Sequence, residues 1–143
     1  FYTNKDGYLT KAKRTVAVCD PSITTDIEGK YKVQSGSYRD YNSAQEEFAK
    51  YSVTIEKAAP GLFYISDFLG GYYDQGRGYG SQYAMTGYIQ LLSDNTIKLL
   101  SSHVDGFGDS LDSMENGKYN PETGEISFDV AYAGQMTFHV VLK

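Results

Sequence analysis

Residues 70–83 combine aromatic, amide and charged side chains in one glycine-rich stretch. Tyrosine rings can offer flat apolar faces to sugar rings, while carboxylate, amide and guanidinium groups can form hydrogen bonds with hydroxyls. Gly76, Gly78 and Gly80 allow the backbone to bend freely and to approach a ligand closely. The segment therefore predicts a ligand-binding loop with these contact residues: Tyr72, Tyr73, Asp74, Gln75, Arg77, Tyr79, Gln82 and Tyr83.

The same composition also suits a tyrosine-rich hairpin whose rings pack across neighbouring strands. In that arrangement Arg77 would pair with Asp74 at the surface and no ligand would bind. The sequence leaves both interpretations open. Phosphate binding is not expected, because the glycines lack the spacing, the following Lys-Ser/Thr and the helix that a P-loop or dinucleotide site requires.

The residues that could bind a metal do not form a recognisable motif. Asp105, Asp109 and Asp112 lack the alternating acids and terminal glutamate of a calcium loop, so we expect them to be solvated. His103 and His139 are the only histidines, and no paired cysteine or histidine accompanies them as a zinc site would need. We expect no metal and no cofactor.

Catalysis is not expected either. No Gly-x-Ser-x-Gly nucleophile motif is present. Carboxylates for glycoside hydrolysis would have to come from Asp67, Asp74 or Glu56, and a small β domain rarely provides the cleft that such a pair needs.

Composition restricts the partners further. A net charge of −5 and a pI near 4.9 argue against a nucleic-acid partner, which requires a basic face. No apolar run approaches the length of a membrane span. The chain starts at Phe1, which suggests a trimmed fragment, and its one cysteine, Cys19, excludes an intrachain disulfide.

Alternating apolar and polar residues predict strands along most of the chain. The clearest pair covers residues 126–132 and 136–142, where every second side chain is apolar. Gly87 interrupts another strand, so we expect a bulge or a close backbone contact there. Residues 43–50 contain a capping-box pattern, and residues 107–116 have helix-like apolar spacing; each predicts a short helical turn.

These elements predict an all-β fold. Seven or eight strands joined mostly by short turns form an antiparallel meander, which must hide its edges. A small lipocalin-like barrel and a strongly curved β-sandwich both satisfy this requirement. The domain would cover residues 27–143, after a linker at residues 21–26 and two strands within residues 1–20.

A resemblance to known proteins adds a cellular context. Residues 8–18, which read YLTKAKRTVAV, resemble the closing strands of bacterial immunoglobulin-like modules, here truncated. The remainder, with IEGKY at residues 27–31 and YISDFLGGYY at residues 64–73, resembles the C-terminal β-rich domain of Bacteroidetes cell-surface lipoproteins, a domain of unknown function.

The resemblance implies an exported protein, in the periplasm or anchored to the outer membrane at the cell surface. Many such lipoproteins are encoded near glycan-uptake genes. We therefore expect a non-catalytic module that binds an oligo- or polysaccharide. The alternative is a structural module that docks protein partners in an outer-membrane assembly.

Overall fold

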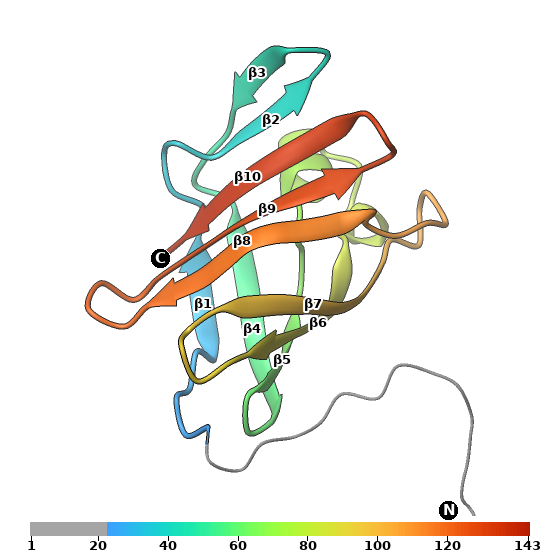
Figure 1. Cartoon of the computed structure of the whole chain (residues 1–143). Coiled ribbons are helices and arrows are strands. Elements are labelled where there is room, and N and C mark those ends of the chain that lie inside the picture. Colours follow the sequence, from blue (N-terminus) through green and yellow to red (C-terminus); the bar gives the residue numbers. More distant parts are fainter. Residues whose placement is uncertain (1–22) are drawn as a thin grey trace, which may run out of the picture.

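The computed structural model describes residues 23–143 as two antiparallel sheets of five strands each, shown in Figure 1. The first sheet has the order β1–β4–β5–β6–β7, with β1 at Gly29–Lys32, β4 at Ser52–Ala59, β5 at Leu62–Ile65, β6 at Thr86–Leu91 and β7 at Ile97–His103. The second has the order β3–β2–β10–β9–β8, with β3 at Ala44–Glu47, β2 at Tyr38–Tyr41, β10 at Met136–Leu142, β9 at Glu125–Tyr132 and β8 at Ser113–Asn120.

The two sheets face one another and bury a shared apolar core. Isolated bridges join the sheets on two sides, between Val33 and Leu142 and between Thr96 and Lys118. Among the described residues, no continuous strand pairing joins one sheet to the other, so the arrangement is a sandwich and not a closed barrel. The all-β prediction is confirmed, and of its two alternatives the sandwich is the one observed.

The strand pair predicted from residues 126–132 and 136–142 is confirmed as β9 and β10. Their register places Phe138 opposite Val130 and Val140 opposite Phe128, and all four side chains are buried. Inward residues on both strands are apolar at every second position. A slip by one residue would expose this entire set, so the alternation fixes the register.

Gly87 makes the close contact that its position in an apolar strand predicts. A Cβ atom added there would lie 2.0 Å from the carbonyl oxygen of Ser101 on the neighbouring strand β7. It would also meet the buried ring of Phe68 at 2.7 Å. Strands β6 and β7 shift register one residue later, at Tyr88.

The helical turn predicted for residues 43–50 is wrong. Asn42 and Ser43 both adopt positive φ, at 53° and 64°, which is the geometry of a two-residue hairpin turn. The turn sends the chain back as strand β3, paired with β2. A local capping pattern was therefore outweighed by strand pairing.

The helical turn predicted for residues 107–116 is also wrong. Val104 and Asp109 form an isolated bridge around a turn, and Gly108 has a φ of 73° that ends any helix. Strand β8 begins at Ser113. The apolar spacing arose because Val104 and Leu111 are buried from separate parts of a loop.

The predicted immunoglobulin-like strands within residues 1–20, together with Cys19, lie outside the described residues. Between residues 23 and 143, none of the helical turns has the length and hydropathy to cross a bilayer.

Candidate functional site

The predicted loop leaves strand β5 and returns at β6, and a buried carboxylate joins its two ends. Asp67 is 2% exposed. Its Oδ1 accepts hydrogen bonds from the backbone N–H groups of Leu69 at 2.8 Å and Met85 at 3.1 Å. Its Oδ2 accepts the N–H of Gly71 at 3.0 Å. Asp67 therefore holds the start of the loop against its end.

The environment of Asp67 acts on its protonation in two directions. Burial raises the pKa of Asp67 from 3.8 to about 7, while the three backbone N–H groups lower it. Burial is the larger effect. Burial makes the charged form of this carboxylate less stable because it loses its hydration. The hydrogen bonds from the backbone offset part of that loss.

The first part of the loop is a single π turn, Tyr72–Gly76, anchored to strand β4. Gln75 both donates and accepts at the backbone of Ser52: its Nε2 donates to the carbonyl at 2.8 Å and its Oε1 accepts the N–H at 3.0 Å. Gly71 precedes the turn with a φ of 80°, and a Cβ there would lie 2.7 Å from Tyr51. The turn therefore packs against the start of strand β4, inside the first sheet.

Tyr72 lies in a charged cluster beneath the loop. Its ring centroid is 5.0 Å from each of the guanidinium carbons of Arg39 and Arg77, which is within range of a cation–π interaction. Its hydroxyl donates to Glu46 at 2.7 Å. Burial, followed by the Glu46 hydrogen bond, raises the pKa of Tyr72 to about 12.

The hairpin interpretation expected Arg77 to pair with Asp74, and this pair does not form. The Nη2 of Arg77 lies 3.2 Å from Glu46 on strand β3 and donates to the hydroxyl of Tyr72. The loop is therefore bound to the second sheet as well as the first. The segment is a π turn followed by a 3-10 turn, Ser81–Tyr83, and not a hairpin.

Four aromatic rings close into a cluster at the outer end of the loop. Tyr73 stacks on Tyr79 with centroids 5.9 Å apart, and Tyr79 meets Tyr83 at 5.4 Å. The ring of Phe107 contacts both ends of this row, with centroid distances of 4.8 Å to Tyr83 and 5.2 Å to Tyr73. We call the three rings that reach the surface, Tyr79, Tyr83 and Phe107, the aromatic patch.

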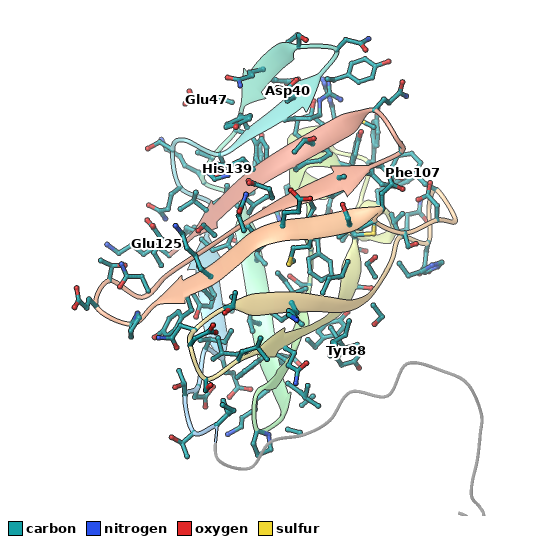
Figure 2. The ribbon with its side chains drawn as sticks, in the orientation of Figure 1. Asp40, Glu47, Tyr88, Phe107, Glu125 and His139 are labelled. Atoms are coloured by element: carbon teal, nitrogen blue, oxygen red, sulfur yellow. The ribbon has the colours of Figure 1, made fainter. Side chains whose placement is uncertain are left out.

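The patch has a buried base and an exposed rim. Tyr73 is 9% exposed and lies beneath the others, whereas Tyr79 is 51% and Phe107 is 42% exposed. Tyr83 is half-buried between them. Figure 2 places Phe107 at one end of the sandwich, on the loop that connects β7 to β8.

Sequence reasoning missed Phe107, because the helix-like spacing assigned it to the core. A different signal was available: Phe107 lies between Gly106 and Gly108 and is flanked by Asp105 and Asp109. Such a context is typical of a turn. An aromatic side chain at the tip of a turn has little to cover it.

The two loops that carry the patch are joined by their backbones. The N–H of Gly106 donates to the carbonyl of Gln82 at 2.7 Å. A Cβ atom on Gly106 would lie 2.4 Å from the ring of Tyr83, so only glycine lets this ring rest against the backbone. The ring positions therefore depend on both loops.

The structure divides the eight predicted contact residues into three groups. Tyr72 and Tyr73 are buried, at 3% and 9% exposed, so their rings do not present flat faces to solvent. Gln75 and Arg77 use their polar groups to anchor the loop. The remaining four lie at the surface or partly so: Asp74, Tyr79, Gln82 and Tyr83.

The candidate metal ligands are each engaged with another polar group. Asp109 accepts a hydrogen bond from Tyr132 at 2.8 Å, and Asp112 accepts the N–H of Gly134 at 2.7 Å. His103 lies 3.0 Å from Asp105, and His139 contacts Asp129. Among residues 23–143, no three His, Cys, Asp or Glu side chains gather in a group that could hold a metal ion.

Comparison with known proteins places this fold in a family. A family model described as a "-like, C-terminal domain" matches residues 20–143. No curated protein matches the chain.

Among solved structures, the lipoprotein BT2262 from Bacteroides thetaiotaomicron is similar, with 48% sequence identity and a TM-score of 0.79. The match covers 84% of this chain and 61% of that one, so this chain spans less than two thirds of the BT2262 chain. The chain therefore belongs to this family of C-terminal domains, and the similarity to BT2262 confirms the resemblance to a β-rich domain of Bacteroidetes lipoproteins.

Proposed function

We propose that this domain is a non-catalytic module of an exported lipoprotein and binds a glycan through the aromatic patch. The observation that carries this proposal is the contiguity of Tyr79, Tyr83 and Phe107 at the surface. Exposed apolar residues that occur singly need no explanation, whereas a contiguous patch rimmed by polar groups suggests a binding site. Asp74 and Gln82 lie on the same loop and are at least partly exposed, and we propose that they supply these polar groups.

Preorganisation supports binding at this surface. Asp67 closes the neck of the loop, Gln75 and Arg77 attach it to the two sheets, and Gly106 attaches it to the neighbouring loop. Rings held in place before binding lose little conformational entropy when a ligand arrives. A sugar ring could then stack on an aromatic face while its hydroxyls reach the rim.

The non-catalytic part of the proposal is supported by the placement of the three acids considered for hydrolysis. Asp67 is buried and engaged with three N–H groups, and Glu56 lies on the exposed face of β4. Neither Asp67 nor Glu56 forms a side-chain hydrogen bond with Tyr79, Tyr83 or Phe107. Only Asp74 belongs to the surface part of the loop.

Similarity to BT2262 supports the proposed location. A lipoprotein carries an acyl anchor, so we propose that this domain works outside the cytoplasm, at the outer membrane, in polysaccharide uptake. The match covers 61% of the BT2262 chain. The role of the full-length protein that contains this domain is therefore also a proposal.

Affinity measurements with paired variants test the proposal. Isothermal titration against dextran, laminarin, inulin and galactomannan oligosaccharides should identify a ligand. A Tyr79→Ala, Phe107→Ala double variant should then bind at least about tenfold more weakly, because two stacking faces are lost. Retained affinity in a folded double variant would contradict the assignment.

Tyr88 provides the matched control. It is 44% exposed and pairs with Tyr64 on the outer face of the first sheet, at a ring distance of 5.4 Å. Figure 2 shows Tyr88 away from Phe107, near strands β6 and β7. Tyr88→Ala removes a ring of similar exposure and should leave glycan affinity unchanged.

A second candidate function is the docking of protein partners in an outer-membrane assembly. The observation that favours it is strand β3, an edge strand whose four residues are all exposed. Unpaired N–H and C=O groups on such an edge can accept a strand from another chain. Recovery of a membrane transporter component with the full-length lipoprotein, lost when Gln45 is changed to Pro, would favour this function over glycan binding.

A further inference from the structure

We infer that the aromatic patch selects uncharged glycans and rejects acidic ones. This inference rests on the proposed function and specifies the ligand class of the same site. It follows from the charges on the two loops that build the patch, residues 70–83 and 104–112. Together these loops carry four aspartates, one arginine and no lysine.

Acidic residues lie on both of the loops that build the patch. Asp74 lies on the loop of Tyr79, and Asp105 and Asp109 flank Phe107 two residues away on either side. Asp105 is strongly exposed, with 81% of its side chain accessible. At physiological ionic strength charges act over about 8 Å, which exceeds the 4.8 and 5.4 Å between neighbouring ring centroids of the patch.

The basic groups nearby all have carboxylate partners. Arg77 is 3.2 Å from Glu46 and donates to Tyr72, which holds it toward strand β3. Arg39 lies 3.6 Å from the same carboxylate and is mostly buried. His103 is 3.0 Å from Asp105. Five carboxylates, those of Asp74, Asp105, Asp109, Asp112 and Glu46, outnumber the two guanidinium groups of Arg39 and Arg77. A uronate or sulfate group at the patch would therefore face a net negative charge.

The aromatic rings also disfavour anionic ligands. The face of an aromatic ring carries negative partial charge, so it favours the C–H groups of a sugar and disfavours an anion. Carboxylate and amide oxygens on the rim accept hydrogen bonds from hydroxyl groups. An uncharged sugar satisfies both requirements, whereas an acidic sugar opposes them.

A salt-dependent comparison of neutral and acidic glycans tests this inference. Dextran, laminarin, inulin and galactomannan would be compared with polygalacturonate and chondroitin sulfate at low and high ionic strength. We expect a neutral glycan to bind with little salt dependence and the acidic glycans to bind at least tenfold more weakly. Their affinity should rise with salt, because salt screens the repulsion.

An Asp105→Asn, Asp109→Asn double variant tests whether the aspartates cause the weak binding of acidic glycans. Asparagine keeps an acceptor oxygen for the hydroxyl of Tyr132 while removing charge. Affinity for the acidic glycans should increase several-fold. An Asp26→Asn, Asp94→Asn variant, with the same change in net charge on exposed turns elsewhere, should leave that affinity unchanged.

The outcomes separate this inference from the proposed function. Acidic glycans that bind as tightly as neutral ones, and lose affinity in the Tyr79→Ala, Phe107→Ala variant, would overturn the charge inference and leave glycan binding standing. Binding of none of the glycans would overturn both. Tighter binding of an oligolysine peptide than of any neutral glycan would also overturn the inference, since the patch would then recognise cations.

Discussion

Asp67 accepts three backbone hydrogen bonds that join the two ends of the loop. Asp67→Ala would leave three buried N–H groups without an acceptor. Each such group costs about 1–3 kcal/mol, so we expect the free energy of unfolding to fall by at least about 3 kcal/mol in chemical denaturation. Asp26→Ala, which removes an exposed acceptor of one local N–H, should cost less than about 1 kcal/mol. Equal losses would contradict this role.

The same residue predicts a pH dependence. Burial raises the pKa of Asp67 from 3.8 to about 7, so the folded state binds this proton more tightly than the unfolded state. The stability that results is present below pH 4 and is lost as the pH rises toward 7. Relative to Asp67→Asn, the wild-type protein should lose on the order of 4 kcal/mol over this range. A constant difference between the two proteins would disprove the raised pKa.

Gly106 tests how the patch depends on backbone contact. Gly106→Ala places a Cβ 2.4 Å from the ring of Tyr83, so the ring must move and we expect glycan affinity to fall about tenfold. Gly108→Ala in the same loop meets no atom within 4 Å but has a φ of 73°. It should cost about 1 kcal/mol of stability and leave affinity unchanged. Equal effects on affinity would show that Tyr83 is not constrained in this way.

Between elements, the anchoring of the loop depends on Gln75. Gln75→Ala removes both hydrogen bonds to Ser52, so we expect faster amide hydrogen exchange over residues 72–83. The N–H groups of β9 and β10 should keep their protection, because these strands lie in the other sheet. Gln135→Ala, at an exposed glutamine in the β9–β10 turn, is the control. Exchange that increases throughout the protein would indicate global destabilisation instead.

Regular elements were predictable from the sequence where alternation ran over two neighbouring strands. The β9–β10 pair and the contact at Gly87 follow directly from side-chain spacing. The hairpin of β2 and β3 was not predictable in this way, because β3 is exposed on every residue and has no apolar alternation. Its turn at Asn42 and Ser43 gave only a weak local signal against the capping pattern.

The candidate site was predictable in position and not in detail. Composition located the loop, but burial of Tyr72 and Tyr73 and the use of Arg77 to bind Glu46 depend on strands far away in the chain. Phe107 comes from another loop altogether. Contacts between separate loops are set by the packing of the two sheets, which no local pattern encodes.

At the scale of the molecule, the sandwich places its most irregular segments together at one end. The β5–β6 loop and the β7–β8 loop meet there, and the patch forms where they touch. The sheets supply a rigid support, while the loops supply the chemistry. This division is consistent with a binding module whose specificity lies in two loops.

Chemical-shift mapping tests the central claim most directly. The 15N-labelled protein would be titrated with the neutral oligosaccharides named above. Binding at the patch predicts that the largest backbone amide shifts occur at Tyr79, Tyr83 and Phe107 and their neighbours. Shifts confined to another surface, such as the one around Tyr64 and Tyr88, or no shift with any of these glycans, would contradict the claim.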